Sequence, residues 1–444
     1  MKLLSDVFEI VKKRNPGENE FLQAVSEVFD SLEDVVARYP KYLKCGLFER
    51  LVEPDRQIIF RVPWTDETGG FHVNRGYRVQ FNDAIGPYKG GLRFSPQVNL
   101  SVIKALGFEQ TFKNSLSGLP IGGAKGGSDF DPKGKSDEEV MRFCQSFMNE
   151  LFKYIGPDED VPAGDQGVGA REIGYLFGQY KRLTGQYHGV LTGKGLSYSG
   201  SLARTEATGY GLVYFAREML KGIDQSLYGK KTVVSGSGNV AIYAAVKAAA
   251  LGAHVIAMSD SQGYIYDPNG IDIETVRDIK EKRRGRISEY VNVHPDAEYH
   301  TGSSGIWKLP CELAMPCATQ NEVDADSAKA LSDNGCILLS EGSNMSCTRE
   351  AIKIIKASGM LYSPGKASNA GGVSVSALEM SQNSMRYFWD FETVDAKLEE
   401  IMKSIYKKAI DTAADFGHQG DIEFGANVSA FLKVADAMMA LGSV

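Results

Sequence analysis

The feature that most constrains the fold lies between Lys231 and Asp260, where a strand pattern, a glycine-rich turn and a helix pattern follow one another directly. Thr232–Ser235 is a short apolar strand, and Gly236-Ser-Gly238-Asn239-Val240-Ala241 comes next, followed by small apolar residues at helical spacing. A second apolar strand then ends at Asp260. This order is typical of a βαβ unit whose turn binds a dinucleotide pyrophosphate, because glycines admit the ligand and the helix offers unpaired N–H groups. A coincidental strand-to-helix turn is the alternative.

The rest of the chain alternates between helix and strand patterns. Apolar residues recur at helical spacing from Phe21 to Val36, and Pro40 is expected to end that helix. Ile58–Trp64 and Phe71–Phe81 are predicted strands joined as a hairpin by turn residues. A further amphipathic helix is expected from Leu398 to Ala409. The predicted fold class is therefore α/β, with a Rossmann-like doubly wound nucleotide domain in the later half.

Composition excludes several function classes. The 444 residues allow two or three domains, and the net charge of −7 argues against non-specific nucleic-acid binding. The six cysteines form no C-x-x-C pair and the six histidines are scattered, so we expect neither a disulfide framework nor a metal site. No signal-peptide core or uninterrupted membrane-spanning run is found, and a cytoplasmic protein is expected.

Three lysines stand in unusual surroundings. Lys89 and Lys125 are each followed by two glycines, which leave room for a ligand, and Lys113 lies three residues after Gln110 on a predicted helix. A single lysine is usually a solvated surface residue. Together, however, these cations predict a pocket for a small dianion, and their mutual repulsion favours a proton-transferring amine.

An acidic residue follows the lysine motifs in a second glycine-rich stretch. Gly164 and Asp165 lie within Pro162-Ala-Gly-Asp-Gln-Gly-Val-Gly. Asp165 is either an ordinary turn residue or an acid that accepts a proton from an amine, and the pattern alone does not decide between them.

These motifs resemble the hexameric glutamate dehydrogenases of the Glu/Leu/Phe/Val dehydrogenase superfamily, of the bacterial NADP type. The resemblance covers essentially the whole chain in order. It rests on Pro-Tyr-Lys-Gly-Gly-Leu-Arg-Phe, Gly-Gly-Ala-Lys-Gly-Gly-Ser-Asp, Pro-Ala-Gly-Asp, Glu206-Ala-Thr-Gly-Tyr-Gly, Met315-Pro-Cys-Ala-Thr-Gln-Asn and Pro364-Gly-Lys-Ala-Ser-Asn-Ala-Gly-Gly. It implies reversible oxidative deamination of glutamate to 2-oxoglutarate and ammonium, in a cleft between two domains.

The resemblance also implies domain boundaries and an assembly. Residues 1–200 plus 370–444 would form a substrate-binding and oligomerisation domain, and residues 201–369 the dinucleotide-binding domain. A homohexamer active in amino-acid metabolism and nitrogen assimilation is implied.

Site residues follow from the same resemblance. Lys125 resembles the catalytic lysine and Asp165 the proton shuttle, with Gly164 contacting the amino group. Lys89 and Ser376 would bind the side-chain carboxylate, while Gln110 and Lys113 would hold the α-carboxylate. The residues expected near the coenzyme are Arg204, Thr208, Gly236, Gly238, Asn239, Val240, Asp260, Ser261, Lys280, Arg286, Ala318 and Asn344.

The coenzyme is predicted to be NADP, with NAD as an additional or alternative coenzyme. An acid at Asp260 ordinarily favours the ribose hydroxyls of NAD. Here Ser261 follows it, and a basic run extends from Lys280 to Arg286, as in NADP-using members of the family. A solvated helix face is the alternative interpretation of that run.

These residues disfavour two rival functions. A branched-chain or aromatic amino-acid dehydrogenase would carry an apolar residue in place of Lys89. A non-catalytic nucleotide sensor would have little need of Lys125 and Asp165 together.

Overall fold

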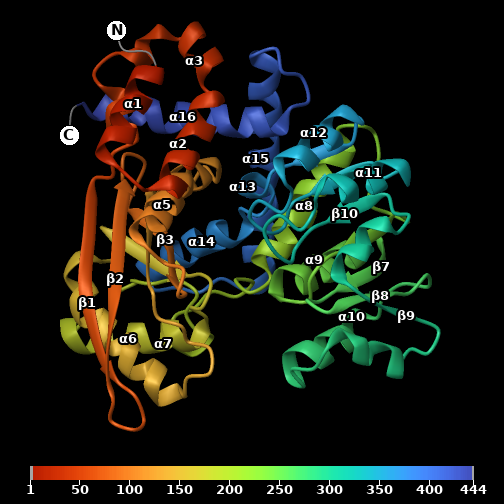
Figure 1. The fold of residues 1–444 in the computed structure, drawn as a ribbon, viewed down its shortest axis with the longest axis horizontal. Coiled ribbons are helices and arrows are strands. Elements are labelled where there is room, and N and C mark those ends of the chain that lie inside the picture. The colour runs from red at the N-terminus through yellow and green to blue at the C-terminus, as the bar shows by residue number, and fades with distance from the viewer. Residues whose placement is uncertain (1–3, 443–444) are drawn as a thin grey trace. The chain divides into compact units, whose positions relative to one another are not determined.

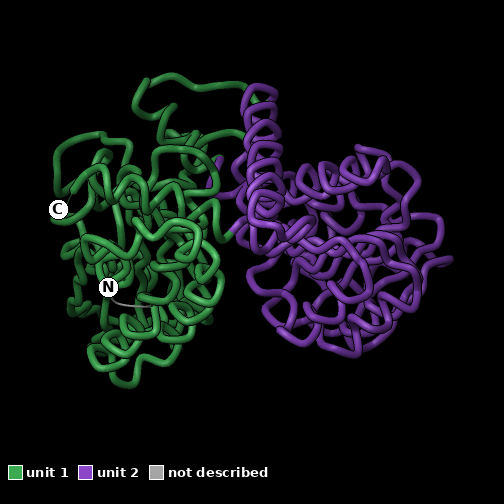
Figure 2. The backbone as a smooth tube through the Cα atoms, turned by 90° about the horizontal axis from the view of Figure 1, so that it is seen from above, with its two compact units in different colours: residues 1–202, 375–391, 427–444 green, residues 203–374, 392–426 purple. Residues whose placement is uncertain are grey.

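The computed structural model describes residues 4–442 and divides into two compact units (Figure 2). Unit 1 comprises residues 1–202, 375–391 and 427–444, and unit 2 comprises residues 203–374 and 392–426. Each unit is built on its own sheet, with helices around it (Figure 1). The α/β class predicted from the sequence is confirmed.

Unit 1 contains a five-stranded mixed sheet in the order β1-β2-β4-β3-β5. β1 pairs antiparallel with β2, and β2 with β4, whereas β3 lies parallel to both β4 and β5. The strands are β1 (Arg56–Thr65), β2 (Phe71–Asn82), β3 (Tyr88–Phe94), β4 (Gly123–Ser128) and β5 (Asp160–Gly164).

Close backbone approach explains why the central strands of this sheet are rich in glycine. A methyl group added at Gly90 would lie 1.6 Å from the carbonyl oxygen of Ala124, and one at Gly126 would lie 2.7 Å from the carbonyl oxygen of Tyr77. Neither position accepts a side chain without movement of the neighbouring backbone. The glycines that flank the lysines are therefore needed by the sheet itself.

The helices of unit 1 cover this sheet and bury an aromatic core. Phe130 and Phe143 stack at 3.8 Å between ring centroids, and Phe94 and Phe147 pack around them. Asn99 caps the helix that carries Gln110 and Lys113. The helices are α1 (Leu4–Arg14), α2 (Asn19–Asp30), α3 (Glu33–Arg38), η1 (Pro40–Leu43), α4 (Leu47–Leu51), α5 (Leu100–Leu116), α6 (Asp137–Leu151), η2 (Phe152–Tyr154), α7 (Ala170–Thr184) and η3 (Leu196–Tyr198).

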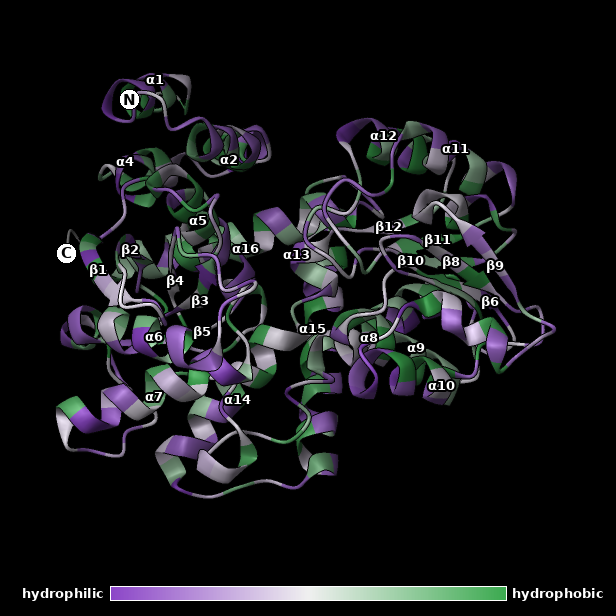
Figure 3. Ribbon diagram, turned by 60° about the horizontal axis from the view of Figure 1, so that its bottom comes forward, coloured by the Kyte–Doolittle hydropathy of each residue, from purple (hydrophilic) through white to green (hydrophobic). Residues whose placement is uncertain are grey.

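Unit 2 contains a seven-stranded sheet in the order β12-β11-β10-β6-β7-β8-β9. The first five strands are parallel, and β8 and β9 add an antiparallel edge. Figure 3 shows the central strands as hydrophobic and β9 as hydrophilic, as expected for a sheet buried at its centre. The strands are β6 (Lys231–Val234), β7 (His254–Ser259), β8 (Gly263–Tyr266), β9 (Glu298–Thr301), β10 (Leu313–Met315), β11 (Leu338–Ser340) and β12 (Leu361–Ser363).

The helices of unit 2 connect these strands, and three long C-terminal helices complete the chain. The βαβ unit predicted from Lys231 to Asp260 is confirmed as β6, α9 and β7. The helices are α8 (Ala207–Lys221), α9 (Asn239–Ala250), α10 (Ile273–Arg277), η4 (Asp278–Lys282), η5 (Ile287–Asn292), η6 (Ser303–Lys308), α11 (Ala325–Asp333), α12 (Arg349–Ala357), α13 (Gly365–Ser368), α14 (Gly371–Met385), α15 (Phe391–Asp415) and α16 (Ile422–Leu441).

Two local predictions have different outcomes. The hairpin of β1 and β2 is confirmed, with Asp66 accepting hydrogen bonds from the backbone N–H groups of Thr68 and Gly70 in the turn. The single helix expected from Phe21 to Val36 is wrong, because α2 ends at Asp30 and α3 starts at Glu33. The Ser31 hydroxyl donates to the carbonyl oxygen of Glu27, a local bond that competes with helix continuation.

The C-terminal segment departs from the predicted boundaries. Residues 375–391 and 427–444 cluster with unit 1, but residues 392–426 cluster with unit 2. The reason is the packing of α15 on α8: Asp395 accepts hydrogen bonds from the hydroxyl of Tyr214 and from Lys247, and Tyr406 packs on Phe215. The sequence showed an amphipathic helix here but not which sheet its apolar face covers.

α16 is long and apolar enough to cross a membrane, judged by length and composition alone. In the structure it belongs to the packed fold: Phe431 stacks on Phe48 and contacts Tyr42, and the carbonyl oxygen of Ala430 accepts a hydrogen bond from Ser115. Among residues 4–442, no group of three or more metal-ligating side chains occurs. The six cysteines are free thiols.

Candidate active site

Two predicted catalytic residues meet in unit 1. Lys125 on β4 is almost fully buried, and its Nζ lies 3.2 Å from Oδ2 of Asp165, which follows β5. The Nε atom of Arg93, on β3 between these strands, donates to the same oxygen over 2.7 Å. The two cations therefore share one carboxylate oxygen, and a fifth or so of the Asp165 side chain (23%) remains exposed.

A glycine provides the space at which these groups converge. A methyl group added at Gly91 would lie 3.3 Å from Nζ of Lys125, 2.8 Å from Cβ of Asp165 and 3.0 Å from the carbonyl oxygen of Gly164. The predicted residues Lys125, Gly164 and Asp165 thus surround a position that only glycine leaves open. A small substrate could approach all three there.

Burial and the neighbouring charges together lower the pKa values of both Lys125 and Asp165. Burial lowers the pKa of Lys125, and the positive charge of Arg93 lowers it further, although Asp165 opposes both effects. Burial alone would raise the pKa of Asp165, but Lys125 and Arg93 outweigh it and bring that pKa down to about 2. The carboxylate is therefore ionised at neutral pH, while the amine loses its proton more readily than a surface lysine would.

Lys89 lies on β3, two residues before Gly91, and is also buried. Its Nζ donates to the hydroxyl of Thr192 over 2.7 Å. Asn114 on α5 donates to the carbonyl oxygen of Lys89 over 2.9 Å and accepts a hydrogen bond from Gln110 over 2.6 Å. Gln110 is thereby held beside β3, where its Cγ would lie 3.4 Å from a methyl group at Gly90.

The remaining predicted substrate residues also lie in unit 1. Lys113 follows Gln110 by one turn of α5 and is half-buried. Ser376 lies on α14 and is buried. The substrate residues predicted from both ends of the chain therefore belong to one compact unit.

The predicted coenzyme turn of unit 2 has an open helix end. Gly236 has a φ of +88°, which favours glycine, and a methyl group there would lie 3.2 Å from the carbonyl oxygen of Cys317. Gly238 precedes α9 with no side-chain cap and nothing within 4 Å of an added methyl group. With Asn239 and Val240 in the first turn, these residues fit a dinucleotide pyrophosphate.

The residues around Asp260 are arranged differently from those of a typical NAD site. Asp260 is buried, and its two oxygens accept hydrogen bonds from the backbone N–H groups of Gln262 and Ile287. Lys280 lies 3.7 Å from the same carboxylate, and Arg286 donates to the exposed hydroxyl of Ser261 over 3.3 Å.

The basic run from Lys280 to Arg286 is therefore not a regular solvated helix face. It begins in the π-helical turn η4, passes through Arg284 at a φ of +55°, and returns to Ser261. Ser261, Lys280 and Arg286 converge beside the end of β7, and Asp260 holds their loop in place.

The other predicted coenzyme residues lie in loops of unit 2 and at the start of α8. Ala318 follows β10, lies beside Gly236, and donates its N–H to Glu322 over 2.9 Å. Asn344 accepts a hydrogen bond from Asn369 over 2.9 Å. Arg204 and Thr208 lie near Gly372, whose added methyl group would be 2.5 Å from the Thr208 hydroxyl.

Sequence reasoning missed four residues that shape these sites. Arg93 could have been found, because Lys89, Gly91 and Arg93 alternate along one face of β3. Thr192 is distant in sequence from its partner Lys89, and Glu322, although it accepts from the nearby N–H groups of Ala318 and Thr319, belongs to no distinctive motif. Ser259, which accepts a hydrogen bond from the Gly236 N–H over 2.8 Å, reads simply as the end of a strand.

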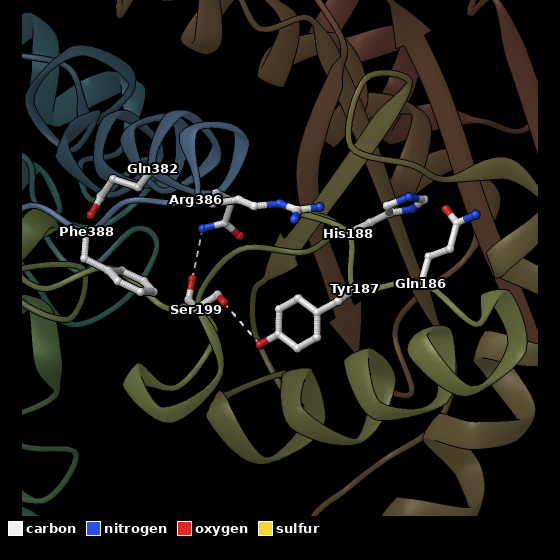
Figure 4. Close-up of a pocket in the computed structure, with 9 residues that line it drawn as sticks. Gln186, Tyr187, His188, Ser199, Gln382, Arg386 and Phe388 are labelled. Carbon is white, nitrogen blue, oxygen red and sulfur yellow. Dashed lines mark hydrogen bonds between the residues drawn. The ribbon is translucent and has the colours of Figure 1, made fainter.

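A pocket of about 600 Å³ lies elsewhere in unit 1, between residues 186–199 and the end of α14 (Figure 4). Tyr187 and Asn383 both hydrogen-bond to Ser199 at its wall. None of the predicted substrate or coenzyme residues lines this pocket, so it does not mark the lysine site.

Comparisons with known proteins match both parts of the chain. The family model described as Glu/Leu/Phe/Val dehydrogenase, dimerisation domain, matches residues 54–182, and that described as Glutamate/Leucine/Phenylalanine/Valine dehydrogenase matches residues 199–442.

Individual relatives match over nearly their whole length. An NADP-specific glutamate dehydrogenase of Helicobacter pylori is 55% identical, over 98% of this chain and 99% of the relative. An NAD-specific glutamate dehydrogenase of Porphyromonas gingivalis is 51% identical, over 98% and 99%. The crystal structure of Plasmodium falciparum glutamate dehydrogenase superposes with a TM-score of 0.96 at 52% identity, covering 99% of this chain and 94% of that one.

Proposed function

The chain belongs to the Glu/Leu/Phe/Val dehydrogenase family, and on that premise we propose that it is a glutamate dehydrogenase that uses NADP(H). The reaction converts L-glutamate, NADP⁺ and water into 2-oxoglutarate, ammonium and NADPH, and is reversible. The observation that carries the proposal is the buried contact between Lys125 and Asp165 beside the open position at Gly91.

The proposed chemistry follows from the proton affinities of these groups. NADP, when bound, accepts the hydride from the substrate Cα. The Lys125 amine takes a proton from the water that attacks the resulting iminium carbon, since burial has lowered its pKa. Asp165, ionised in the resting site, accepts a proton from the α-ammonium group of glutamate before hydride transfer. It later returns this proton to the amino nitrogen, which leaves as ammonia while the carbonyl forms and the hydroxyl proton passes to solvent.

The substrate is proposed to be a five-carbon dicarboxylate because the site has cationic or hydrogen-bonding groups for two carboxylates. Lys89 and Ser376 would bind the side-chain carboxylate, and Gln110 and Lys113 the α-carboxylate. A buried ammonium such as that of Lys89 would be costly in a pocket for an apolar side chain, which disfavours a branched-chain or aromatic substrate.

The proposed preference for NADP rests on the loop around Asp260. Its carboxylate is already engaged by two backbone N–H groups, so it has less capacity to accept from a ribose hydroxyl. Ser261, Lys280 and Arg286 would instead contact the 2′-phosphate. NAD use remains the second candidate, because an NAD-specific relative is nearly as similar as the NADP-specific one.

We further propose a cytoplasmic homohexamer. Support for self-association comes from the β1–β2 hairpin, where Phe71 is 87% exposed and Val73 65% exposed on an outer ribbon of the sheet. Exposed apolar side chains on an outer ribbon favour burial against another chain.

Turnover of the purified protein tests the proposed function. NADPH oxidation is measured with 2-oxoglutarate and ammonium, then with NADH in its place, and K125M serves as the inactive control. We expect kcat/KM to be at least about 10-fold higher with NADPH, because a matched phosphate contact contributes over 1 kcal/mol. A higher value with NADH would refute the coenzyme preference, and no turnover with either would refute the function.

A further inference from the structure

A strained loop places the Thr192 hydroxyl within hydrogen-bonding distance of Lys89. Leu191 has a φ of +61°, unusual for a side chain branched beyond Cβ, and Gly193 has a φ of +82°. Between them, Thr192 donates its N–H to the carbonyl oxygen of Pro162 over 2.9 Å and accepts from Lys89 through its hydroxyl. Because two left-handed residues flank Thr192, its side-chain direction depends on whatever holds this loop in place.

That loop is held by a carboxylate on α14. Glu379 accepts hydrogen bonds from the N–H groups of Gly193 (2.9 Å) and Lys194 (3.4 Å), and from Nζ of Lys194 (2.8 Å). The same Nζ donates to the carbonyl oxygen of Leu191. Both side chains of the pair are 0% exposed.

The same helix carries a residue of the substrate site. Ser376 precedes Glu379 by three positions on α14, so the two lie on neighbouring turns of one helix face. The carboxylate that holds the Thr192 loop is thus rigidly connected to Ser376.

We propose that the Lys194–Glu379 pair is a positioning element for recognition of the substrate's distal carboxylate. It fixes Thr192, and through it the Lys89 ammonium, relative to Ser376. This inference rests on the proposed function, because it assigns the pair to the specificity of that same site. The residues that bear the effect are Lys194 and Glu379, neither of which needs to touch the substrate.

A purely structural ion pair is the competing explanation, and substrate discrimination separates the two. A structural pair would affect all substrates equally. A positioning pair would affect a dicarboxylic 2-oxo acid far more than a monocarboxylic one of similar length, since only the former uses Lys89 and Ser376.

Two double variants test the proposal without leaving a buried charge unpaired. K194M/E379M removes both the charges and the acceptor for the Gly193 N–H. K194M/E379Q removes the charges but keeps an amide oxygen for that N–H. The matched control is K104M/E18M, which removes another lysine–glutamate pair of unit 1, at 2.7 Å.

The measurements are KM and kcat for 2-oxoglutarate and for 2-oxobutyrate, with NADPH affinity as a check on folding. For K194M/E379M we expect KM for 2-oxoglutarate to rise about 10-fold or more, and kcat/KM for 2-oxobutyrate to change less than about 3-fold. K194M/E379Q should lose less discrimination than K194M/E379M, because its amide oxygen still accepts from the Gly193 N–H, and the control should retain discrimination within about 3-fold of the parent. Equal losses on both substrates, unchanged discrimination in K194M/E379M, or a defect in K194M/E379Q as large as in K194M/E379M would overturn the proposal.

Glutarate binding separates this proposal from the proposed function. By calorimetry, glutarate should bind the parent protein more tightly than butyrate, and K194M/E379M should lose most of that difference. If the parent failed to turn over 2-oxoglutarate but the glutarate preference depended on the pair, the proposed function would fail and the positioning role would stand. If glutarate affinity were unaffected in K194M/E379M, the positioning role would fail.

Discussion

Arg93 contributes to the proton affinities of the two residues that are proposed to move protons. It donates to Asp165 over 2.7 Å, and its guanidinium is always charged. It thereby lowers the pKa of Asp165 and also that of Lys125. Removing this cation should therefore raise both values.

R93Q is expected to move the acidic limb of the pH profile of kcat/KM for L-glutamate, measured in the deaminating direction, to higher pH. The amine of Lys125 must be neutral to act as a base, and its pKa rises once the neighbouring positive charge is lost. A shift of about one unit would lower kcat/KM near neutral pH by about 10-fold. R93K, which retains the charge, should keep the parent profile within about 0.3 units. A shift to lower pH in R93Q would contradict this assignment.

Lys89 is the residue that should decide the substrate class. K89L is expected to lower kcat/KM for glutamate at least about 100-fold, because a buried charge-assisted contact to the distal carboxylate is lost. Activity on an apolar amino acid such as norvaline should fall far less or rise, since the pocket becomes apolar. Both rates are measured in the deaminating direction, and an equal loss on both would contradict the role of Lys89.

The lysine motifs were visible in the sequence because they carry rare residues at fixed short spacings. Lys89 and Lys125 were predicted from such local context, whereas the role of Asp165 followed only from the family resemblance. The structure brings Lys125 and Asp165 within 3.2 Å. Thr192 and Glu379 were not predictable, because a threonine or a glutamate in isolation has no distinctive pattern. Their importance depends on contacts with residues more than 100 positions away.

At the scale of elements, the unit formed by β6, α9 and β7 was predicted because its strand, turn and helix are contiguous in the chain. The break between α2 and α3 was not, since it depends on a hydrogen bond from Ser31 that helical spacing does not show. The sequence also did not predict which sheet α15 packs against. Its apolar stripe, at Leu398, Met402 and Ile405, is compatible with either sheet.

Two glycines of the coenzyme turn should respond differently to the same substitution. G236A places a side chain at a φ of +88° and 3.2 Å from backbone, so we expect a loss of about 1–2 kcal/mol in the free energy of unfolding. G238A meets nothing within 4 Å and has a φ of −89°, so its stability should change by less than about 0.5 kcal/mol.

G238A should weaken coenzyme binding although it leaves the stability of the protein nearly unchanged. Its methyl group would occupy the space through which the pyrophosphate reaches the start of α9, so NADPH affinity should fall about 10-fold although the fold is intact. Denaturant unfolding and NADPH fluorescence titration measure the two effects. Parent-like NADPH affinity in G238A would show that the pyrophosphate does not bind at this turn.

At the scale of the whole molecule, the net charge of −7 is a sum that conceals two local groups of positively charged side chains. Lys89, Arg93 and Lys125 form a cationic group in unit 1, and Lys280 and Arg286 form a second one in unit 2. An acidic substrate and a phosphorylated coenzyme each require such a group, whereas the remaining acidic surface favours solubility.

Self-association is the remaining property of the whole molecule that the sequence implied only through family resemblance. β1 is an edge strand, and the adjoining hairpin exposes Phe71 and Val73. F71E/V73E should reduce the mass measured by light scattering from about six times the 48.4 kDa chain to a smaller assembly, because two charges cannot be buried in an apolar contact.

The matched control for this change is Y228E, since Tyr228 is 81% exposed in unit 2. It should leave the mass of the assembly unchanged, and circular dichroism should show that both variants remain folded. If F71E/V73E kept the parent mass, the hairpin would not lie in an essential interface. If the parent protein itself were a monomer, the homohexamer would be refuted. The edge strand and the two exposed apolar side chains would then be stable in solvent without a partner.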